Sequence, residues 1–362
     1  MLRRMRRAQI CGYLLRKSAL AQWIPQAESL CSLEGGKMFL VSILILVVGF
    51  VALIKGADWF VDGSSAMAKT LHVPGVIIGL TIVAFGTSAP ELAVSTLAAL
   101  QGSNEIAISN VVGSNIFNLL CVLGVCSLIY PVPVEKGILN RDYPVTIAVT
   151  VIVLLGACFK TLFSTGWVHI DMDSNVGLIS RPLSIALLLF FIAYIVYLII
   201  DAKKNPTEDD DIDVQPLWKS VVLIIIGIML IIGGGQAVVY AAKAIARTFG
   251  MTETLIGLTI VAVGTSLPEL VTSIVAAKKG ETGMAVGNVV GSNIFNMMFI
   301  LGISSLIHPI DVNMASLWDL IILVIVSVIV YVFSCTKRNI GKREGAIMLL
   351  IYLADMVFAI LR

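Results

Sequence analysis

A stretch of 40 residues occurs twice in this chain, and each copy places one carboxylate inside an apolar run. Residues 79–118 and 257–296 align without a gap, 178 positions apart, and are identical at 26 of 40 positions. The two carboxylates are Glu91 and Glu269. A charged side chain at the centre of a bilayer costs on the order of 3 kcal/mol, so it marks a functional site by default. Two of them at equivalent places in a duplicated membrane unit predict one site shared by two halves.

The composition is that of a membrane protein. Apolar residues make up 58% of the chain and charged residues 13%, against about 25% in soluble domains. The mean hydropathy is +0.98. The six cysteines and three histidines lack the spacing of a disulfide framework or a zinc site, so we expect the cysteines to serve packing. These features exclude a large soluble enzyme and a soft-metal protein.

Apolar stretches between helix-breaking residues predict ten membrane helices. Their expected limits are 39–66, 74–100, 106–129, 144–162, 183–200, 217–246, 252–277, 284–307, 317–334 and 344–361.

Each copy of the repeat falls on the second and third helix of a five-helix half. Because five is odd, the second half must enter the membrane from the opposite side, and the halves are therefore inverted. The expected fold is an all-α polytopic membrane protein of ten transmembrane helices in two inverted five-helix repeats. The repeats should occupy residues 38–200 and 217–362.

The charge of the connecting loops predicts the orientation. Loops on one face carry 12 Lys and Arg residues and those on the other face carry 4, which places the first face in the cytoplasm. That face includes Lys278 and Lys279, whereas the equivalent turn of the first repeat, 101–105, should lie outside. We expect an integral, multi-pass protein of the plasma (inner) membrane.

Three segments lie outside the repeated helices. Residues 1–37 form a basic extension that we expect to be disordered or absent from the mature fold, with translation favoured to begin at Met38. Residues 201–216 read as a cytoplasmic acidic linker rather than a calcium loop, because the glycine turn and terminal Glu of such a loop are missing. The polar segment 164–181 could form a short hairpin.

The repeats carry GTSAPE (86–91) and GTSLPE (264–269). A proline within a helix removes one backbone donor and clashes with the carbonyl four residues earlier, so both helices should break here. We expect this to free carbonyls, which a bound cation would satisfy. The carbonyls are those of Ala84, Phe85, Ala262 and Val263, and the neighbouring hydroxyls are those of Thr87, Ser88, Thr265 and Ser266.

The second motif is GSNIFN, at 113–118 and 291–296. Ser114 and Asn118 are four residues apart and share one helix face, as do Ser292 and Asn296. Asn115 and Asn293 should hold the helices in register, and Asn110 and Asn288 should be structural. An alternative stays open for each hydroxyl, since Ser and Thr in membrane helices often bond to the carbonyl four residues earlier.

Together these groups predict an all-oxygen cation site. Carboxylate, amide, hydroxyl and carbonyl oxygens suit hard cations such as Ca²⁺ and Na⁺. No cofactor, nucleic acid or obligate protein partner is implied, so the ions and the lipid bilayer are the expected partners. The predicted ligands are Glu91, Glu269, Asn118, Asn296, Thr87, Ser88, Thr265, Ser266, Ser114 and Ser292.

The paired GTSAPE/GTSLPE and GSNIFN motifs resemble the two alpha-repeats of the sodium/calcium exchanger family, within the cation/calcium antiporter superfamily. The resemblance covers residues 38–362 and implies that Glu91 and Glu269 coordinate calcium, while the hydroxyls and amides serve sodium. It also implies that the first and sixth helices slide across the core. Gly56 and 233–235 would suit such smooth contacts, and we interpret Asp58 and Asp62 as interface or gate residues.

One position separates this chain from part of that family. Potassium-dependent members and some prokaryotic members carry Asp where this chain has Asn296. With Asn at both 118 and 296 the site holds two carboxylates rather than three, which argues against potassium co-transport and predicts a potassium-independent, prokaryotic-type member.

The predicted function is secondary-active exchange of calcium for sodium by alternating access. The nearest alternative is a calcium/proton antiporter that uses the same two glutamates, because burial raises the pKa of a carboxyl group. An intramembrane protease is disfavoured, since the motifs offer Ser and Glu without a His or Lys partner. A cation channel is also disfavoured, because duplicated broken helices fit alternating access better than a ring. We do not expect an enzyme.

Overall fold

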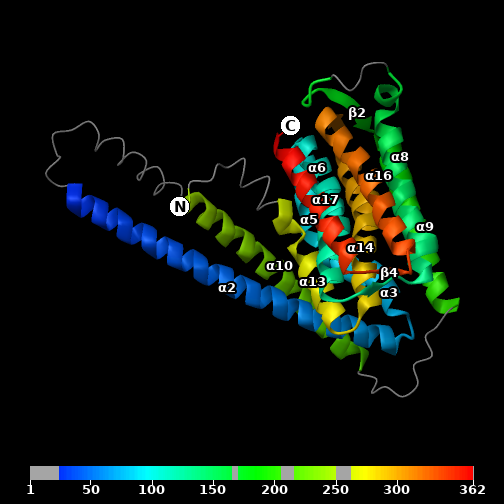
Figure 1. Cartoon of the computed structure of the whole chain (residues 1–362), viewed down its shortest axis with the longest axis horizontal. Coiled ribbons are helices and arrows are strands. Elements are labelled where there is room, and N and C mark those ends of the chain that lie inside the picture. Colours follow the sequence, from blue (N-terminus) through cyan, green and yellow to red (C-terminus); the bar gives the residue numbers. More distant parts are fainter. Residues whose placement is uncertain (1–23, 165–169, 205–215, 250–261, 362) are drawn as a thin grey trace.

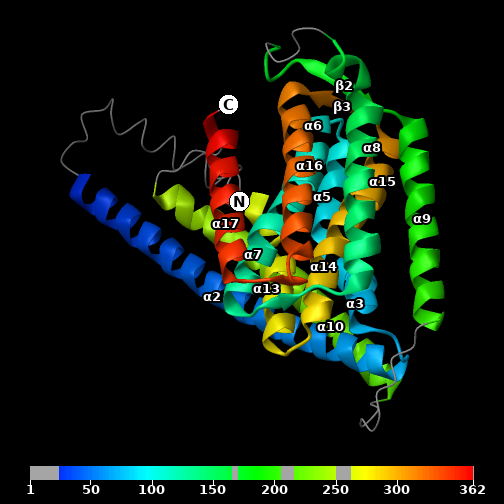
Figure 2. The same cartoon turned by 45° about the vertical axis from the view of Figure 1, so that its right-hand side comes forward.

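The protein is an elongated bundle of helices from which two long helices slant away (Figures 1 and 2). The computed structural model describes residues 24–164, 170–204, 216–249 and 262–361. Eight helices in this part of the chain are long and apolar enough to cross a membrane, and one bent pair makes a ninth. The remaining predicted span, 252–277, is described from Ala262 onward. The class and the positions of the helices therefore agree with those predicted.

The first repeat contains the following elements: α2 (Ile24–Thr70), α3 (Gly75–Ile78), η2 (Gly79–Val83), α4 (Ala84–Thr87), α5 (Ala89–Leu100), α6 (Asn104–Phe117), η3 (Asn118–Val122), α7 (Leu123–Ile129), β1 (Val132–Pro133), η4 (Ile138–Asp142), α8 (Tyr143–Leu162), β2 (Asn175–Ile179) and α9 (Arg181–Lys204).

The second repeat contains α10 (Leu217–Thr248), α12 (Ala262–Thr265), α13 (Leu267–Lys278), α14 (Thr282–Phe295), η7 (Asn296–Ile300), α15 (Leu301–Ile307), β3 (Ile310–Asn313), α16 (Met314–Cys335), β4 (Asn339–Ile340) and α17 (Lys342–Leu361). The elements marked η are π-helical turns.

Helices α2 and α10 form an antiparallel pair that crosses the bundle at a slant (Figures 1 and 2). Glycines spaced seven residues apart bring the two backbones together, as small residues do between membrane helices. A Cβ added to Gly56 would lie 2.8 Å from the Ile231 backbone nitrogen, and one on Gly234 would lie 2.7 Å from the Leu53 nitrogen. The prediction that Gly56 and Gly234 face the core is therefore wrong, because both lie inside this pair.

Two other glycines provide the contact between this pair and the core. A Cβ on Gly86 would lie 2.9 Å from Cζ of Phe60, and one on Gly264 would collide with a methyl group of Val239. Gly86 and Gly264 belong to the two motifs that precede the helix breaks. The absence of side chains there lets α2 and α10 pass directly over the broken helices.

Two short sheets join the repeats at opposite ends of the bundle. Strand β1 pairs with β4, and strand β2 pairs with β3, both antiparallel. The two sheets occupy equivalent places in the two repeats, because β1 and β3 begin 178 residues apart, which is the offset of the repeat, at Val132 and Ile310. The segment 164–181, which we predicted as a local hairpin, instead supplies β2 to a strand of the other repeat. Residues 165–169 lie outside the described part.

The ends of the broken helices confirm the inversion. The α5–α6 turn, including Gly102 and Ser103, shares a pocket with Asn175 and Asn313 of the β2–β3 sheet. The equivalent α13–α14 turn lies at the other end, where a Cβ on Gly283 would lie 2.7 Å from Oε1 of Glu135, next to β1 (Figure 2). Equivalent turns thus lie at opposite ends of the molecule.

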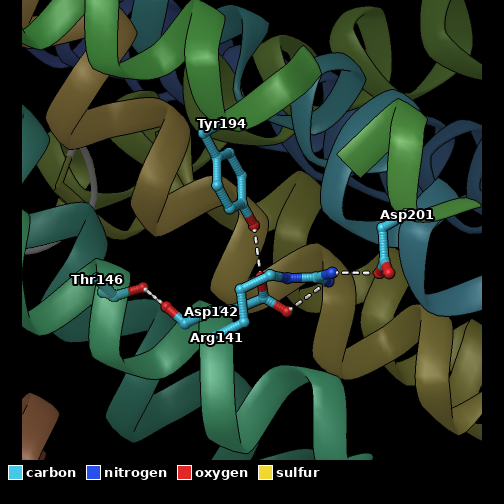
Figure 3. Close-up of polar contacts among 5 residues, drawn as sticks. All are labelled: Arg141, Asp142, Thr146, Tyr194 and Asp201. Atoms are coloured by element: carbon cyan, nitrogen blue, oxygen red, sulfur yellow. Dashed lines mark hydrogen bonds and ion pairs between the residues drawn. The ribbon is translucent and has the colours of Figure 1, made fainter. Parts of the chain in front are cut away.

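A buried charge cluster fastens α9 to the start of α8 (Figure 3). Arg141 pairs with Asp142 at 2.6 Å and with Asp201 at 2.5 Å, while the Tyr194 hydroxyl donates to Asp142 over 2.9 Å. Asp142 is fully buried, which is tolerated because each of its carboxylate oxygens accepts a hydrogen bond. The Thr146 hydroxyl donates to the Asp142 backbone carbonyl.

Two predicted boundaries need correction. Helix α2 begins at Ile24 rather than at 39, because a continuous helix precedes the apolar run. Residues 1–23 lie outside the described part. The idea that the extension is not part of the mature fold stays a prediction. The linker predicted to begin at residue 201 begins later, because α9 continues to Lys204 and Asp201 is held by Arg141. Residues 205–215 are outside the described part.

The inverted arrangement predicts opposite labelling of two equivalent turns. We expect single cysteines at Gln101 and Lys278, both exposed, to react with a membrane-impermeant maleimide from opposite sides, with Lys278→Cys reacting from the cytoplasm. The measurement uses a cysteine-free background in oriented vesicles, with Cys335, which is exposed, restored alone as a positive control. Labelling of both cysteines from one side would mean that the repeats are parallel.

Candidate ion-binding site

The two helix breaks place Glu91 and Glu269 at equivalent helix starts. Ser88, with φ −83° and ψ 9°, separates α4 from α5, and Ser266, with φ −94° and ψ 7°, separates α12 from α13. The first break bends its span by 50°, as the proline predicted. Each Glu lies in the first turn of the following helix, where the positive end of the helix dipole favours a negative charge.

Each glutamate accepts a hydrogen bond from the helix break of the other repeat. The Ser88 hydroxyl donates to Oε1 of Glu269 over 2.7 Å, and the Ser266 hydroxyl donates to Oε1 of Glu91 over 3.0 Å. Ser114 adds a longer contact of 3.4 Å to the same Glu91 oxygen. Both glutamates and both break serines are fully buried. The two halves therefore share one site.

Several buried oxygens of this site have no hydrogen-bond partner within the described part of the chain. They are Oε2 of Glu91, Oε2 of Glu269, Oδ1 of Asn118, Oδ1 of Asn296 and the hydroxyl of Ser292. An unpaired buried polar atom costs on the order of 1–3 kcal/mol, and more when it is charged. A cation surrounded by these oxygens would remove that cost.

Four asparagines hold the centre of the site together across the repeats. Nδ2 of Asn115 donates to the backbone carbonyl of Asn293 over 3.2 Å, and Nδ2 of Asn293 donates to that of Asn115 over 3.3 Å. Their side-chain oxygens accept from Nδ2 of Asn296 at 3.0 Å and of Asn118 at 3.2 Å. Because the amide nitrogens of Asn118 and Asn296 are occupied in this way, their oxygens are left to face a ligand.

Thr87 and Thr265 bond to asparagines of the opposite repeat. Thr87 Oγ1 lies 3.0 Å from Oδ1 of Asn288, and Thr265 Oγ1 lies 3.4 Å from Oδ1 of Asn110. Thr87 also contacts the Val83 carbonyl at 3.1 Å, which is the back-bonding that we left open as an alternative. Each hydroxyl can thus donate its hydrogen to a protein oxygen, while the lone pairs of its own oxygen remain available to a cation.

Asn110 and Asn288 support the backbone beside the glutamates. Asn110 Nδ2 donates to the Glu91 carbonyl over 3.2 Å and to Ser95 over 2.9 Å. Asn288 makes the matching pair of bonds, to the Glu269 carbonyl at 3.5 Å and to Ser273 at 2.9 Å. Sequence reasoning missed Ser95 and Ser273, although their conservation between the two repeats could have indicated them.

The backbone carbonyls contribute less than predicted. The Ala84 carbonyl accepts from the Ser88 amide at 3.0 Å, and the Val263 carbonyl accepts from the Ser266 amide at 3.2 Å. The prediction that these two are free is wrong, because each helix closes one more hydrogen bond before it breaks. For Phe85 and Ala262 it stays a prediction.

Two π-helical turns begin at the site and were not predicted. They start at Asn118 (η3) and Asn296 (η7), at equivalent positions of the two repeats. Single π-turns in α-helices occur frequently at functional sites. The apolar pattern gives no signal for them, because the residues that follow, such as Leu119 and Met297, are buried in either helix type.

The chemistry of the assembled groups is that of a hard-cation site. Within the described residues no three His, Cys, Asp or Glu side chains cluster closely enough to hold a metal ion. The two glutamates are therefore complemented by hydroxyl and amide oxygens. Such ligand sets suit Ca²⁺ and Na⁺ rather than soft metals.

Comparison with known proteins decides the family. The family model described as sodium/calcium exchanger protein matches residues 41–200 and 219–361, which include every residue of the site. The chain belongs to the sodium/calcium exchanger family. It is thus a multi-pass membrane antiporter in which the two matched segments correspond to the two repeats described above.

Similar proteins in this family match over most of their length. The chain is 36% identical to a putative antiporter, CaxA of Alkalimonas amylolytica, over 87% of this chain and 97% of that protein. It is 33% identical to the inner membrane protein YrbG of Escherichia coli, over 86% and 94%. A structure of the sodium-calcium exchanger NCX_Mj superposes with a TM-score of 0.74 at 31% identity, covering 88% of this chain and 99% of that one.

Proposed function

We propose that this family member exchanges Ca²⁺ for Na⁺ across the plasma membrane by alternating access at the site between the two helix breaks. Glu91 and Glu269 bind calcium, and the hydroxyls and amides around them form neighbouring sodium positions. These are Thr87, Ser88, Thr265, Ser266, Ser114, Ser292, Asn118 and Asn296.

The crossed bonds from Ser88 to Glu269 and from Ser266 to Glu91 carry this proposal. They bring two carboxylates from opposite repeats into one buried volume and leave one oxygen of each unpaired. The resulting charge of −2 is neutralised either by one Ca²⁺ or by more than one Na⁺. A site that cannot bind Ca²⁺ and Na⁺ at the same time exchanges one ion for the other.

Sodium rather than proton coupling is favoured by the neutral oxygens. A proton needs only a carboxylate, whereas the unpaired amide oxygens of Asn118 and Asn296 and the hydroxyl of Ser292 supply further oxygen ligands that a hard metal ion uses and a carboxyl-bound proton does not need. The calcium/proton alternative rests on the glutamates alone, because a buried carboxylate can be neutralised by a proton as well as by a cation.

The relatives agree with this proposal. NCX_Mj is named a sodium-calcium exchanger and was studied in Na⁺ and Sr²⁺, an ion with the charge of Ca²⁺. The name of YrbG places that relative in the inner membrane, and on this basis we assign the chain to the plasma membrane.

Glu91→Gln and Glu269→Gln should each reduce calcium exchange to less than about a tenth of the unsubstituted level, since each removes half the charge of the site while keeping its shape. The measurement is ⁴⁵Ca²⁺ flux in proteoliposomes, with size-exclusion profiles to confirm folding. Glu105→Gln, at an exposed carboxylate near the start of α6, is the matched control and should leave the flux unchanged. Normal flux in either buried variant would remove both glutamates from the site.

Asn296→Asp should add a third carboxylate and lower the half-saturating calcium concentration about threefold or more, while calcium release slows. Asn118→Asp should act in the same way, since the two amides are equivalent. The measurement is calcium exchange against external K⁺ and Na⁺, with the melting temperature recorded because Asp also loses the bond to Asn115 or Asn293. Asn339→Asp, at an exposed residue of β4, is the control. An unchanged ion dependence in both site variants would assign these asparagines to helix packing.

A further inference from the structure

Ion pairs tie α2 to the α13–α14 turn at one end of the bundle. Nζ of Lys279 lies 2.6 Å from Oδ1 of Asp58 and 2.7 Å from Oδ1 of Asp62, and it donates to the Asp58 backbone carbonyl over 3.0 Å. One ammonium group thus donates to three acceptors on two successive turns of α2. Burial lowers the pKa of Lys279, but its hydrogen bonds to Asp58 and Asp62 outweigh this and raise it, so the group stays charged.

A second contact joins the same two elements. The Ser65 hydroxyl donates to Oε1 of Glu281 over 2.5 Å. Asp58, Asp62 and Ser65 are spaced by four and three residues, so they lie along one face of α2. Lys55 approaches Asp58 at 3.7 Å from within α2 itself and is largely exposed, so it does not bridge the elements. The bridging charge is that of Lys279.

Below these contacts an apolar layer packs between α2 and α13. Ala57, Phe60 and Val61 of α2 are fully buried in one cluster with Ala276 and Ala277 of α13. Separation of α2 from α13 at this end would expose that layer, and it would first break the bonds of Lys279 and Ser65.

The equivalent interface of the other half, between α10 and the α5–α6 turn, cannot form the ion pairs that Lys279 makes with Asp58 and Asp62. The repeat offset of 178 residues maps Asp58 and Asp62 onto Gln236 and Tyr240 of α10, and it maps Lys279 onto Gln101. None of these three side chains is charged. The same offset maps Ser65 onto Lys243 and Glu281 onto Ser103, so the set of one lysine and two aspartates occurs in one half and not at the equivalent positions of the other, although the ion site between them is nearly symmetric.

We propose that Lys279 with Asp58 and Asp62, supported by Ser65 with Glu281, forms an electrostatic latch that holds the α2–α10 pair closed over the end predicted to face the cytoplasm. The inference rests on the proposed function, alternating access, and assigns the opening of the site to each side in turn to movement of this pair. The latch stabilises the state closed to the cytoplasm, and the equivalent positions Gln236, Tyr240 and Gln101 of the other half lack its charges. Ion release to the cytoplasm then requires three bonds of one lysine to break.

A buried reporter cysteine tests the latch without any transport measurement. In the cysteine-free background, Ala277→Cys should react slowly with an impermeant maleimide applied from the side of the α13–α14 turn. Lys279→Gln should raise this rate about three- to tenfold, as expected for a partly exposed ion-pair network. Lys278→Gln, at the exposed neighbour that makes no ion pair within the described residues, should leave the rate unchanged. Equal rates in the two variants would overturn the latch.

A cross-link tests the same contact in the closed state. Ser65→Cys with Glu281→Cys should form a disulfide on oxidation, slow calcium exchange at least about tenfold, and recover on reduction. Full exchange by the cross-linked protein would show that α2 need not leave this turn, and would overturn the latch. If the protein without the two cysteines showed no sodium-driven exchange, that result would count against the proposed function instead. The labelling rates of the Ala277→Cys reporter would then still show whether the latch exists.

Discussion

The rest of the structure depends on a crossed exchange of hydrogen bonds, in which the serine at each helix break donates to the glutamate of the other repeat. Ser88 and Ser266 can do so only because both spans break at the same place, and the spans break because a proline follows in each. Within its own repeat Glu91 has only the longer contact from Ser114 at 3.4 Å, so the shorter side-chain hydrogen bond to each glutamate comes from the other repeat. The inverted duplication thus supplies both the second charge and the donors that make the first charge tolerable in a membrane.

The asparagines also form reciprocal hydrogen bonds between the repeats, and these bonds orient neutral oxygens of the site. Asn115 and Asn293 clamp the backbones of α6 and α14 and also fix the amide nitrogens of Asn118 and Asn296, which leaves two oxygens without partners. Over this hydrogen-bonded centre the α2–α10 pair passes at Gly86 and Gly264, where the core helices carry no side chain. A fixed site and a separate, closely packed pair of helices are the parts that alternating access requires.

The sequence was sufficient for the helices, the inversion and the convergence of the two repeated motifs at one place, because apolar length, an odd helix number and a repeated motif each have a direct physical consequence. It was insufficient where tertiary contacts decide. Gly56 and Gly234 pack within the α2–α10 pair rather than against the core, and the carbonyls of Ala84 and Val263 are satisfied. The π-turns at Asn118 and Asn296 and the pairing of β2 with β3 depend on neighbours distant in the chain. Asp58 and Asp62 were expected at an interface, but their partner Lys279 could not be identified from spacing alone.

Alternation of the site between calcium and sodium can be measured by ⁴⁵Ca²⁺ uptake into proteoliposomes with an imposed sodium gradient, compared with an imposed pH gradient of equal size. We expect uptake that is driven by sodium inside the vesicles, abolished when sodium is equal on both sides, and unaffected by a protonophore. Uptake that follows the pH gradient and ignores sodium would contradict this expectation, and would assign the two glutamates to proton exchange.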